Sequence, residues 1–178
     1  MKLKSSMQVA LTAMFAALYA VGVVFLGPIS FQVFQVRVAD ALLPLAMVFG
    51  WPAIIGLSLG AFVANVFGGL GPVDMIGGAL ANFIATFLAW RIVSRKGKRW
   101  SPIGIGVEIL VVTLVVGTYL SFLLAIPLLL SWFGLLLGSM TAIGILGSIL
   151  LYALSRRHIV NFLDSHSPRH EAMASVQK

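Results

Sequence analysis

The sequence predicts an all-α integral membrane protein, a compact bundle of six transmembrane helices with both termini in the cytoplasm. Of the 178 residues, 60% are hydrophobic and 10% are charged, whereas about 25% of the residues in a soluble domain are charged. Mean hydropathy is +1.06. Apolar stretches of about 20 residues, the length that crosses about 30 Å of hydrocarbon, recur along the chain. A surface with so few charges suits lipid and not water.

Turn residues and polar clusters divide the apolar sequence into six predicted spans. Four of the five divisions fall at residues 27–28, 50–52, 68–72 and 94–102, which are rich in Gly, Pro or charge, and the fifth follows Pro127. The second span is too short to cross the membrane unaided, so it is expected to tilt or to continue an extended segment. The N-terminal apolar run is expected to be a span and not a cleaved leader. The predicted spans are residues 6–26, 40–49, 52–67, 73–93, 103–127 and 132–154.

The basic residues predict the orientation of these spans. With the N-terminus inside, every Lys and Arg except Arg37 falls on the cytoplasmic side, as the positive-inside rule requires. The net charge of +7 is therefore expected to anchor the chain at the lipid bilayer, and no nucleic acid partner is expected. Residues 1–155 are predicted to form a substrate-binding membrane domain, and residues 156–178 a polar cytoplasmic tail.

Small residues recur at every fourth position and predict close contacts between helices. The first predicted span carries two such pairs, Ala13 with Ala17 and Ala16 with Ala20. The third, fourth and sixth spans carry Gly and Ala at the same spacing. Packing within one chain explains most of these faces, and at least one is available to another subunit.

Polar residues within the apolar sequence are the candidates for a binding site, because ionisable groups in a membrane usually face a cavity or a partner. Asp74, Asn82 and Thr86 fall on one stripe of the fourth span, with Asn82 about 12 Å deeper than Asp74 at about 1.5 Å per residue. Glu108 and Tyr119 share a face of the fifth span. The predicted substrate-binding residues are Arg37, Asp40, Asn65, Asp74, Asn82, Glu108 and Tyr119.

Each candidate also has a structural interpretation. Arg37 and Asp40 are spaced to pair with each other at the interface, and Asp74 is placed to cap a helix N-terminus. Asn65 and Asn82 are suited to interhelical hydrogen bonds. Glu108 lies near the predicted inner end of its span, where it is positioned to pair with the basic cluster at residues 91–99.

The sequence also excludes several classes of function. Without Cys, the chain holds no disulfide, Cys-ligated zinc or thiol nucleophile. It has no phosphate-binding loop of the Walker A type and no recognisable catalytic constellation, and no metal or cofactor is predicted. The three His residues follow the last span, where a solvated tail is favoured over a metal site. These features indicate a binding protein and not an enzyme.

The stretch from Phe31 to Ile92 resembles the QueT family, substrate-binding S components of energy-coupling-factor (ECF) transporters. The resemblance is carried by "FQVRVADALLPL" at residues 34–45 and by "IIGLSLGAFVANVFGGLGPVDMIGGALANFIAT" at residues 54–86. It covers about a third of the chain. The alanine-rich "ALTAMFAAL" at residues 10–18 is similar to the face by which S components dock on their transmembrane partner.

The resemblance implies a function, partners and a ligand. The chain would capture a queuosine precursor, a 7-deazaguanine base, at the outer face of the cell membrane. A transmembrane T component and two ATP-binding cassette ATPases would then drive its release inside, with Ala13, Ala16, Ala17 and Ala20 at the docking surface. Asp74 or Glu108 would accept N–H donors of the base, and Arg37 with Asp40 would order an outer lid.

The resemblance weakens in the second half of the chain. Residues 134–144 lack the Gly-Glu pair that the family often carries in its last helix, and Glu108 stands where the family tends to have Asn. The alternatives to this assignment are an S component for another vitamin or nucleobase, a stand-alone secondary transporter, and a membrane-embedded enzyme or assembly factor.

Overall fold

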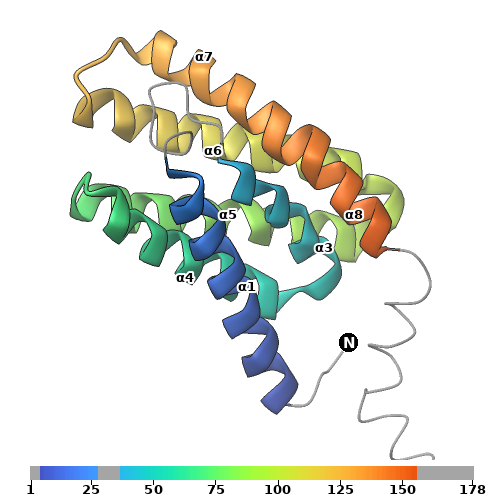
Figure 1. Ribbon diagram of the computed structural model, residues 1–178. Coiled ribbons are helices and arrows are strands. Elements are labelled where there is room, and N and C mark those ends of the chain that lie inside the picture. The colour runs from blue at the N-terminus through green and yellow to red at the C-terminus, as the bar shows by residue number, and fades with distance from the viewer. Residues whose placement is uncertain (1–4, 28–36, 156–178) are drawn as a thin grey trace, which may run out of the picture.

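The computed structural model describes residues 5–27 and 37–155, which form helices joined by short turns (Figure 1). The predicted all-α fold is confirmed for this part of the chain. The elements are α1 (Ser5–Phe25), η1 (Val38–Leu45), α3 (Ala46–Phe49), α4 (Trp51–Gly68), α5 (Pro72–Lys96), η2 (Lys98–Trp100), α6 (Ser101–Leu123), α7 (Leu128–Ser139), η3 (Met140–Gly147) and α8 (Ser148–Leu154).

Five stretches of the described chain are long and apolar enough to cross a membrane. They are α1, α4, α5, the stretch from η2 through α6, and the stretch from α7 through α8. Proline stands in the first turn of α4, α5 and α6, where its missing N–H costs nothing. Gly69 ends α4 in the left-handed conformation, with φ of 72°. The predicted fifth span was too long, because its helix ends at Leu123 and not near Pro127.

The second predicted span is a shorter apolar element that runs from Val38 to Phe49. Its first eight residues form a 3-10 helix, η1, and its last four form α3. A 3-10 helix rises about 2.0 Å per residue and an α-helix about 1.5 Å, so the pair extends for about 22 Å. This stretched geometry gives the segment more reach than its length in residues suggested, although it remains shorter than a bilayer core.

The last predicted span is one continuous helical stretch with a change of winding at its centre. Between α7 and α8 the residues of η3 adopt the wider π-helical form, which often accompanies functional sites. A Cβ added at Gly147 would come within 2.9 Å of the Pro44 ring and 3.2 Å of the Ala41 carbonyl oxygen. The glycine therefore lets the last span pack directly on the backbone of η1.

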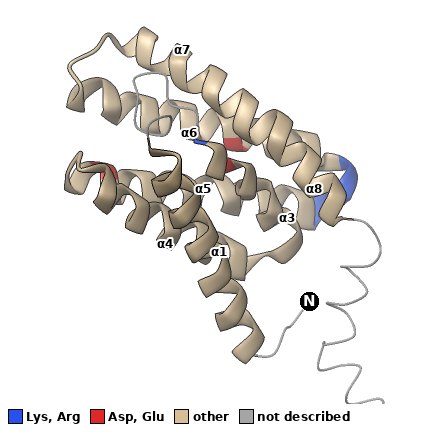
Figure 2. Cartoon of the chain, viewed as in Figure 1, with Lys and Arg blue, Asp and Glu red and all other residues tan. Residues whose placement is uncertain are grey.

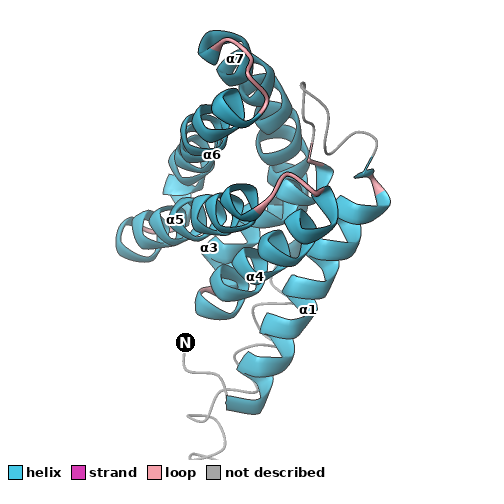
Figure 3. Ribbon diagram, turned by 90° about the vertical axis from the view of Figure 1, so that its left-hand side faces the viewer, coloured by secondary structure: helices cyan, strands magenta, loops and turns pink. Residues whose placement is uncertain are grey.

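Consecutive segments of the chain alternate in direction. Gly50, at the start of α4, lies against Trp90 near the end of α5, and Gly77 near the start of α5 lies against Tyr119 near the end of α6. The turn between α4 and α5 therefore marks one end of the bundle, and Figure 3 looks along the bundle from that side. The first turns of α1 and the end of α8 lie away from that turn (Figure 1).

Most small-residue faces pack inside the chain, as the sequence predicted. A Cβ at Gly60 would lie 2.7 Å from the Ala16 carbonyl oxygen, and one at Gly56 would lie 2.5 Å from that of Thr12. These glycines of α4 therefore hold α1 in backbone contact. Ala81, Ala85 and Ala89 of α5 are likewise buried.

The first helix is different, because it is the least buried of the five long stretches. Ala16 and Ala20 turn partly toward the bundle, whereas Ala13 and Ala17 are exposed. The two alanine pairs therefore serve different surfaces, one facing α4 and one facing away from it.

Figure 2 shows the described basic residues other than Arg37 at one end of the bundle, whereas the acidic residues lie at the other end and in the middle. Apart from Arg37, the described Lys and Arg residues lie at the end of α5 and in η2, where they are mostly exposed. The three described carboxylates are all buried. Acidic and basic groups are thus kept apart, with the acidic groups inside the bundle.

Candidate substrate-binding site

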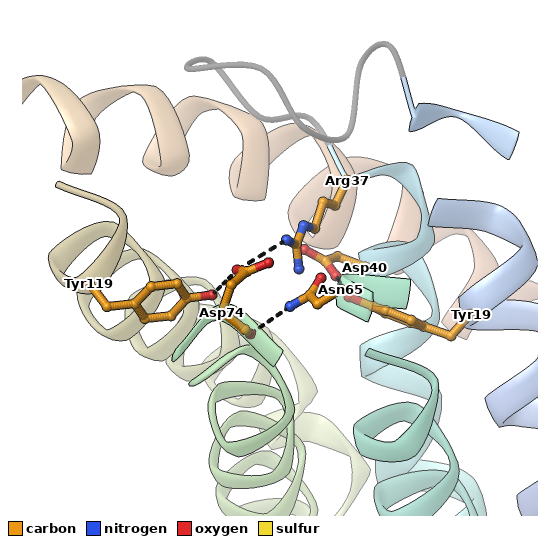
Figure 4. A network of polar contacts seen from close by, with 6 residues as sticks. All are labelled: Tyr19, Arg37, Asp40, Asn65, Asp74 and Tyr119. Carbon is orange, nitrogen blue, oxygen red and sulfur yellow. Dashed lines mark hydrogen bonds and ion pairs between the residues drawn. The ribbon is translucent and has the colours of Figure 1, made fainter. Parts of the chain in front are cut away.

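Asp74 lies in the first turn of α5 and is the centre of a buried polar cluster (Figure 4). Tyr119 of α6 donates a 2.9 Å hydrogen bond to Asp74 Oδ1. The Arg37 guanidinium reaches the same oxygen at 3.9 Å. Asn65 of α4 donates a 2.8 Å hydrogen bond to the backbone carbonyl of Asp74. One acidic residue therefore joins α4, α5, α6 and the segment that leads into η1.

The small residues around Asp74 make this convergence possible. A Cβ added at Gly78 would lie 2.3 Å from Asn65 Nδ2, and one added at Gly77 would lie 2.9 Å from the Tyr119 ring. The glycines therefore leave the space that the amide and the aromatic ring occupy. The pattern of one acid followed by two glycines positions polar groups from both neighbouring helices.

A second polar contact joins α1 to η1. The Tyr19 hydroxyl donates a 2.5 Å hydrogen bond to Asp40 Oδ1, and both side chains are buried. Tyr19 was not among the predicted site residues. It has a signal in the sequence, because a tyrosine inside an apolar span needs a partner for its hydroxyl. Only the fold shows that this partner is Asp40.

Asn82 and Thr86 continue the polar stripe of α5 toward the opposite end. Asn82 Nδ2 donates a long hydrogen bond of 3.5 Å to the Leu57 carbonyl oxygen, which links α5 to α4. Thr86 donates its hydroxyl to the Asn82 carbonyl oxygen at 2.6 Å. The predicted stripe is confirmed: Asp74, Gly78, Asn82 and Thr86 are all buried on one side of α5.

Glu108 on α6 is fully buried, and neither of its carboxylate oxygens has a hydrogen-bond partner within the described ranges. The predicted pairing with the basic cluster at residues 91–99 is therefore wrong, because that cluster lies on the exposed end of α5 and on η2. The charge that acts on Glu108 within the described chain is that of Asp40. Glu108 faces the same interior as the acidic residues of the polar cluster.

The structural interpretations of the other candidates are partly confirmed. Asn65 and Asn82 do form interhelical hydrogen bonds. The N-cap of α5 is Gly71 and no side chain makes a capping hydrogen bond there, but Asp74 does lie in the first turn, where its charge complements the helix dipole as predicted. Arg37 and Asp40 are buried at 6% and 4% exposure, and their charges act on each other inside the bundle. The segment before Arg37, residues 28–36, lies outside the described residues, as does the predicted tail at 156–178, so the predicted outer lid stays a prediction.

The polar cluster, and not a cavity elsewhere, is the best candidate for substrate recognition. A cavity of about 300 Å³ opens near the other end of the bundle, between α3, α6 and α8. Its lining is mainly apolar and contains no acidic residue. Among the described residues, no group of three or more metal-binding side chains is arranged to hold a metal ion. The polar cluster instead offers acceptors and a guanidinium for a polar organic ligand.

The fold and this cluster define a multi-pass membrane protein whose interior is built for polar recognition. The QueT transporter family matches residues 9–156. The chain belongs to that family, and the predicted membership is confirmed over far more of the chain than the stretch that suggested it. No curated protein matches the chain, and no solved structure matches it.

Proposed function

We propose that this chain is the substrate-binding S component of an ECF transporter and that it captures a 7-deazaguanine queuosine precursor. In this proposal it works with a T component and two ATPases and does not chemically change its ligand. The observation that carries the proposal is a pair of spare acceptors in the polar cluster. Within the described residues, Asp74 Oδ2 and Asn65 Oδ1 are buried without a hydrogen-bond partner.

Spare acceptors of this kind suit the edge of a guanine-like base. Such an edge carries adjacent N–H donors, and a carboxylate accepts them in strong charge-assisted hydrogen bonds. Leaving buried acceptors unpaired costs about 1–3 kcal/mol each, so a ligand that pairs them recovers that cost. Tyr119 and Arg37 hold the Asp74 carboxylate in place, which reduces the ordering needed on binding.

The distribution of charge supports the proposed orientation. The described basic residues other than Arg37 lie at the end of the bundle away from Asp74 (Figure 2). The positive-inside rule places that end, and with it both termini, in the cytoplasm. The element from Val38 to Phe49 would then serve as the sixth crossing. The polar cluster would face the outside, where a nutrient is captured.

The exposed face of α1 supports the proposed partnership. Ala13 and Ala17 lie on the least buried long helix and face away from α4. Small exposed residues allow a second helix to approach closely in lipid. We propose that the T component docks there, and that Ala16 and Ala20 serve mainly the packing of α1 on α4.

A ligand screen on the purified protein tests the proposal. Calorimetry and thermal shift would be measured with 7-deazaguanines, guanine and a panel of B vitamins. A ligand at about a thousandfold excess over Kd stabilises the folded state by about 4 kcal/mol. We expect a response to the deazaguanines that is lost in Asp74→Asn and kept in Thr141→Ala. Thr141 is a suitable control because its exposed hydroxyl bonds only within its own helix.

The other outcomes separate the alternatives. Binding of a vitamin without the deazaguanines would keep the S-component proposal and reject its substrate. Uptake in cells that lack the T component and ATPases, abolished by an uncoupler, would support a secondary transporter. Recovery of a modified ligand after incubation would indicate an enzyme.

A further inference from the structure

The ionisable groups in the interior of the bundle do not balance. Asp40, Asp74 and Glu108 are buried carboxylates, and Arg37 is the buried guanidinium of the described residues. Three carboxyl groups thus face one guanidinium in the described interior. Residues 28–36, which lead into this region, contain no ionisable side chain. That stretch of sequence therefore carries no positive side chain.

Glu108 is the carboxylate that lacks any compensation within the described chain. Asp74 accepts the Tyr119 hydroxyl and lies 3.9 Å from Arg37, and Asp40 accepts the Tyr19 hydroxyl. Neither oxygen of Glu108 accepts a hydrogen bond from a described residue. A buried carboxylate with no partner is strongly unfavourable, and an ionisable residue inside a membrane indicates a functional role.

The position of Glu108 relates it to the polar cluster. It shares a face of α6 with Tyr119, eleven positions along the chain and therefore about 16 Å deeper in the bundle. The charge of Asp40 acts on Glu108. A ligand held near Asp40 and Asn82 would therefore be exposed to the electrostatic field of Glu108.

From this charge pattern we infer that the site selects a substrate carrying a positive charge, and that Glu108 is the residue that determines this selection. The inference rests on the proposed function and adds to it the charge of the substrate. Fixed charges act over several ångströms in a poorly solvated interior, because the effective dielectric constant is far below that of water. Glu108 therefore does not need to touch the ligand to favour a cation. The same field gives a neutral base no such advantage and disfavours an anion.

Two matched 7-deazaguanines test this inference. The 7-aminomethyl base is a cation near neutral pH, whereas the 7-cyano base is neutral and has the same ring. We expect calorimetry with the unaltered protein to give a Kd for the cation at least about tenfold lower than for the neutral base, a difference of about 1.4 kcal/mol. Glu108→Gln keeps the size and hydrogen-bonding groups of the side chain and removes its charge, so we expect this ratio to fall about tenfold in the variant.

Thr113→Val is the matched control, because Thr113 is also a buried residue of α6 whose hydroxyl has no partner within the described residues. It should leave the ratio unchanged. Glu108→Asp keeps the charge and should keep the preference for the cation. If Glu108→Gln does not fold, the ratio in the unaltered protein and in Glu108→Asp still tests the inference.

The outcomes distinguish this inference from the proposed function. Equal affinity for the two bases, or a ratio that Glu108→Gln leaves unchanged, would overturn the inference while the proposed function stands. Failure of the folded, unaltered protein to bind either base would overturn both.

Discussion

Tyr119 donates its hydroxyl to Asp74 across a 2.9 Å hydrogen bond, although the two residues are 45 positions apart in the chain. The bond joins the last part of α6 to the first turn of α5, at the end of the bundle where Arg37 and Asn65 also meet Asp74. It therefore links the binding residues to the packing of two long helices. Stability and recognition are expected to change together at this point.

Replacing Tyr119 by Phe removes the hydroxyl and keeps the ring. A hydrogen bond to a charged group contributes about 1.5–3 kcal/mol, so we expect the free energy of unfolding to fall by about 2 kcal/mol. The ligand should also bind more weakly, because Asp74 loses a group that orients it. Thermal unfolding in detergent and calorimetry would measure the two effects. Unchanged stability and affinity would show that the bond contributes nothing in the membrane protein.

The Arg37–Asp74 pair can be tested by a double-mutant cycle. Removing one partner of a buried ion pair typically costs about 3–5 kcal/mol, because the other charge is left uncompensated. We expect Arg37→Gln to destabilise the protein by about 3 kcal/mol. The double variant Arg37→Gln with Asp74→Asn should lose less than the sum of the single losses. Additive losses in chemical unfolding would mean that the two charges do not interact across their 3.9 Å separation.

Gly60 is expected to tolerate no side chain. A Cβ there would lie 2.7 Å from the Ala16 carbonyl oxygen and 2.8 Å from Tyr19 Cβ, and overpacking typically costs about 1–3 kcal/mol. Gly60→Ala should therefore reduce stability by about 2 kcal/mol and disturb the Tyr19–Asp40 contact. In Gly106→Ala the added Cβ meets nothing within 4 Å, so that helix should gain up to about 1 kcal/mol. Equal effects at the two glycines in thermal unfolding would contradict this assignment.

Two substitutions on α1 separate docking from internal packing. Ala13→Leu adds bulk on the exposed face, so we expect transport by the assembled complex to fall at least about tenfold while the isolated chain binds ligand normally. Ala16→Leu adds the same bulk on the side that meets α4, so folding and ligand binding should both suffer. Uptake assays and calorimetry on both variants provide the comparison. Loss of binding in Ala13→Leu would show that this face is also internal.

Much of the bundle is predictable because hydrophobic length and turn residues are local properties. The first, third and fourth predicted spans agree with α1, α4 and α5 to within about three residues at each end. The short second span was located correctly, but its 3-10 geometry was not foreseen. That geometry depends on how η1 packs against Gly147 of the last span, and such a contact leaves no local pattern.

The candidate residues were easier to find than their partners. Arg37, Asp40, Asp74 and Glu108 are conspicuous because a charge within an apolar sequence is rare. From the sequence alone, Arg37 was paired with Asp40 because the two are three positions apart. Glu108 was paired with the basic cluster at residues 91–99 because both were expected near the inner membrane surface. In the fold Arg37 also lies 3.9 Å from Asp74, Asp40 accepts the Tyr19 hydroxyl, and Glu108 is buried in the interior and not paired with that cluster.

By itself, the sequence determined that this chain is a multi-pass membrane protein, where most of its helices begin and end, and which polar residues lie within them. These properties follow from transfer of side chains between water and lipid, which each residue contributes nearly independently. Only the tertiary structure decided that Tyr19 belongs to the polar cluster, that Ala13 and Ala16 face different surfaces, and that Glu108 is buried without a partner among the described residues. These depend on contacts between distant segments, where the position of one helix sets the surroundings of another.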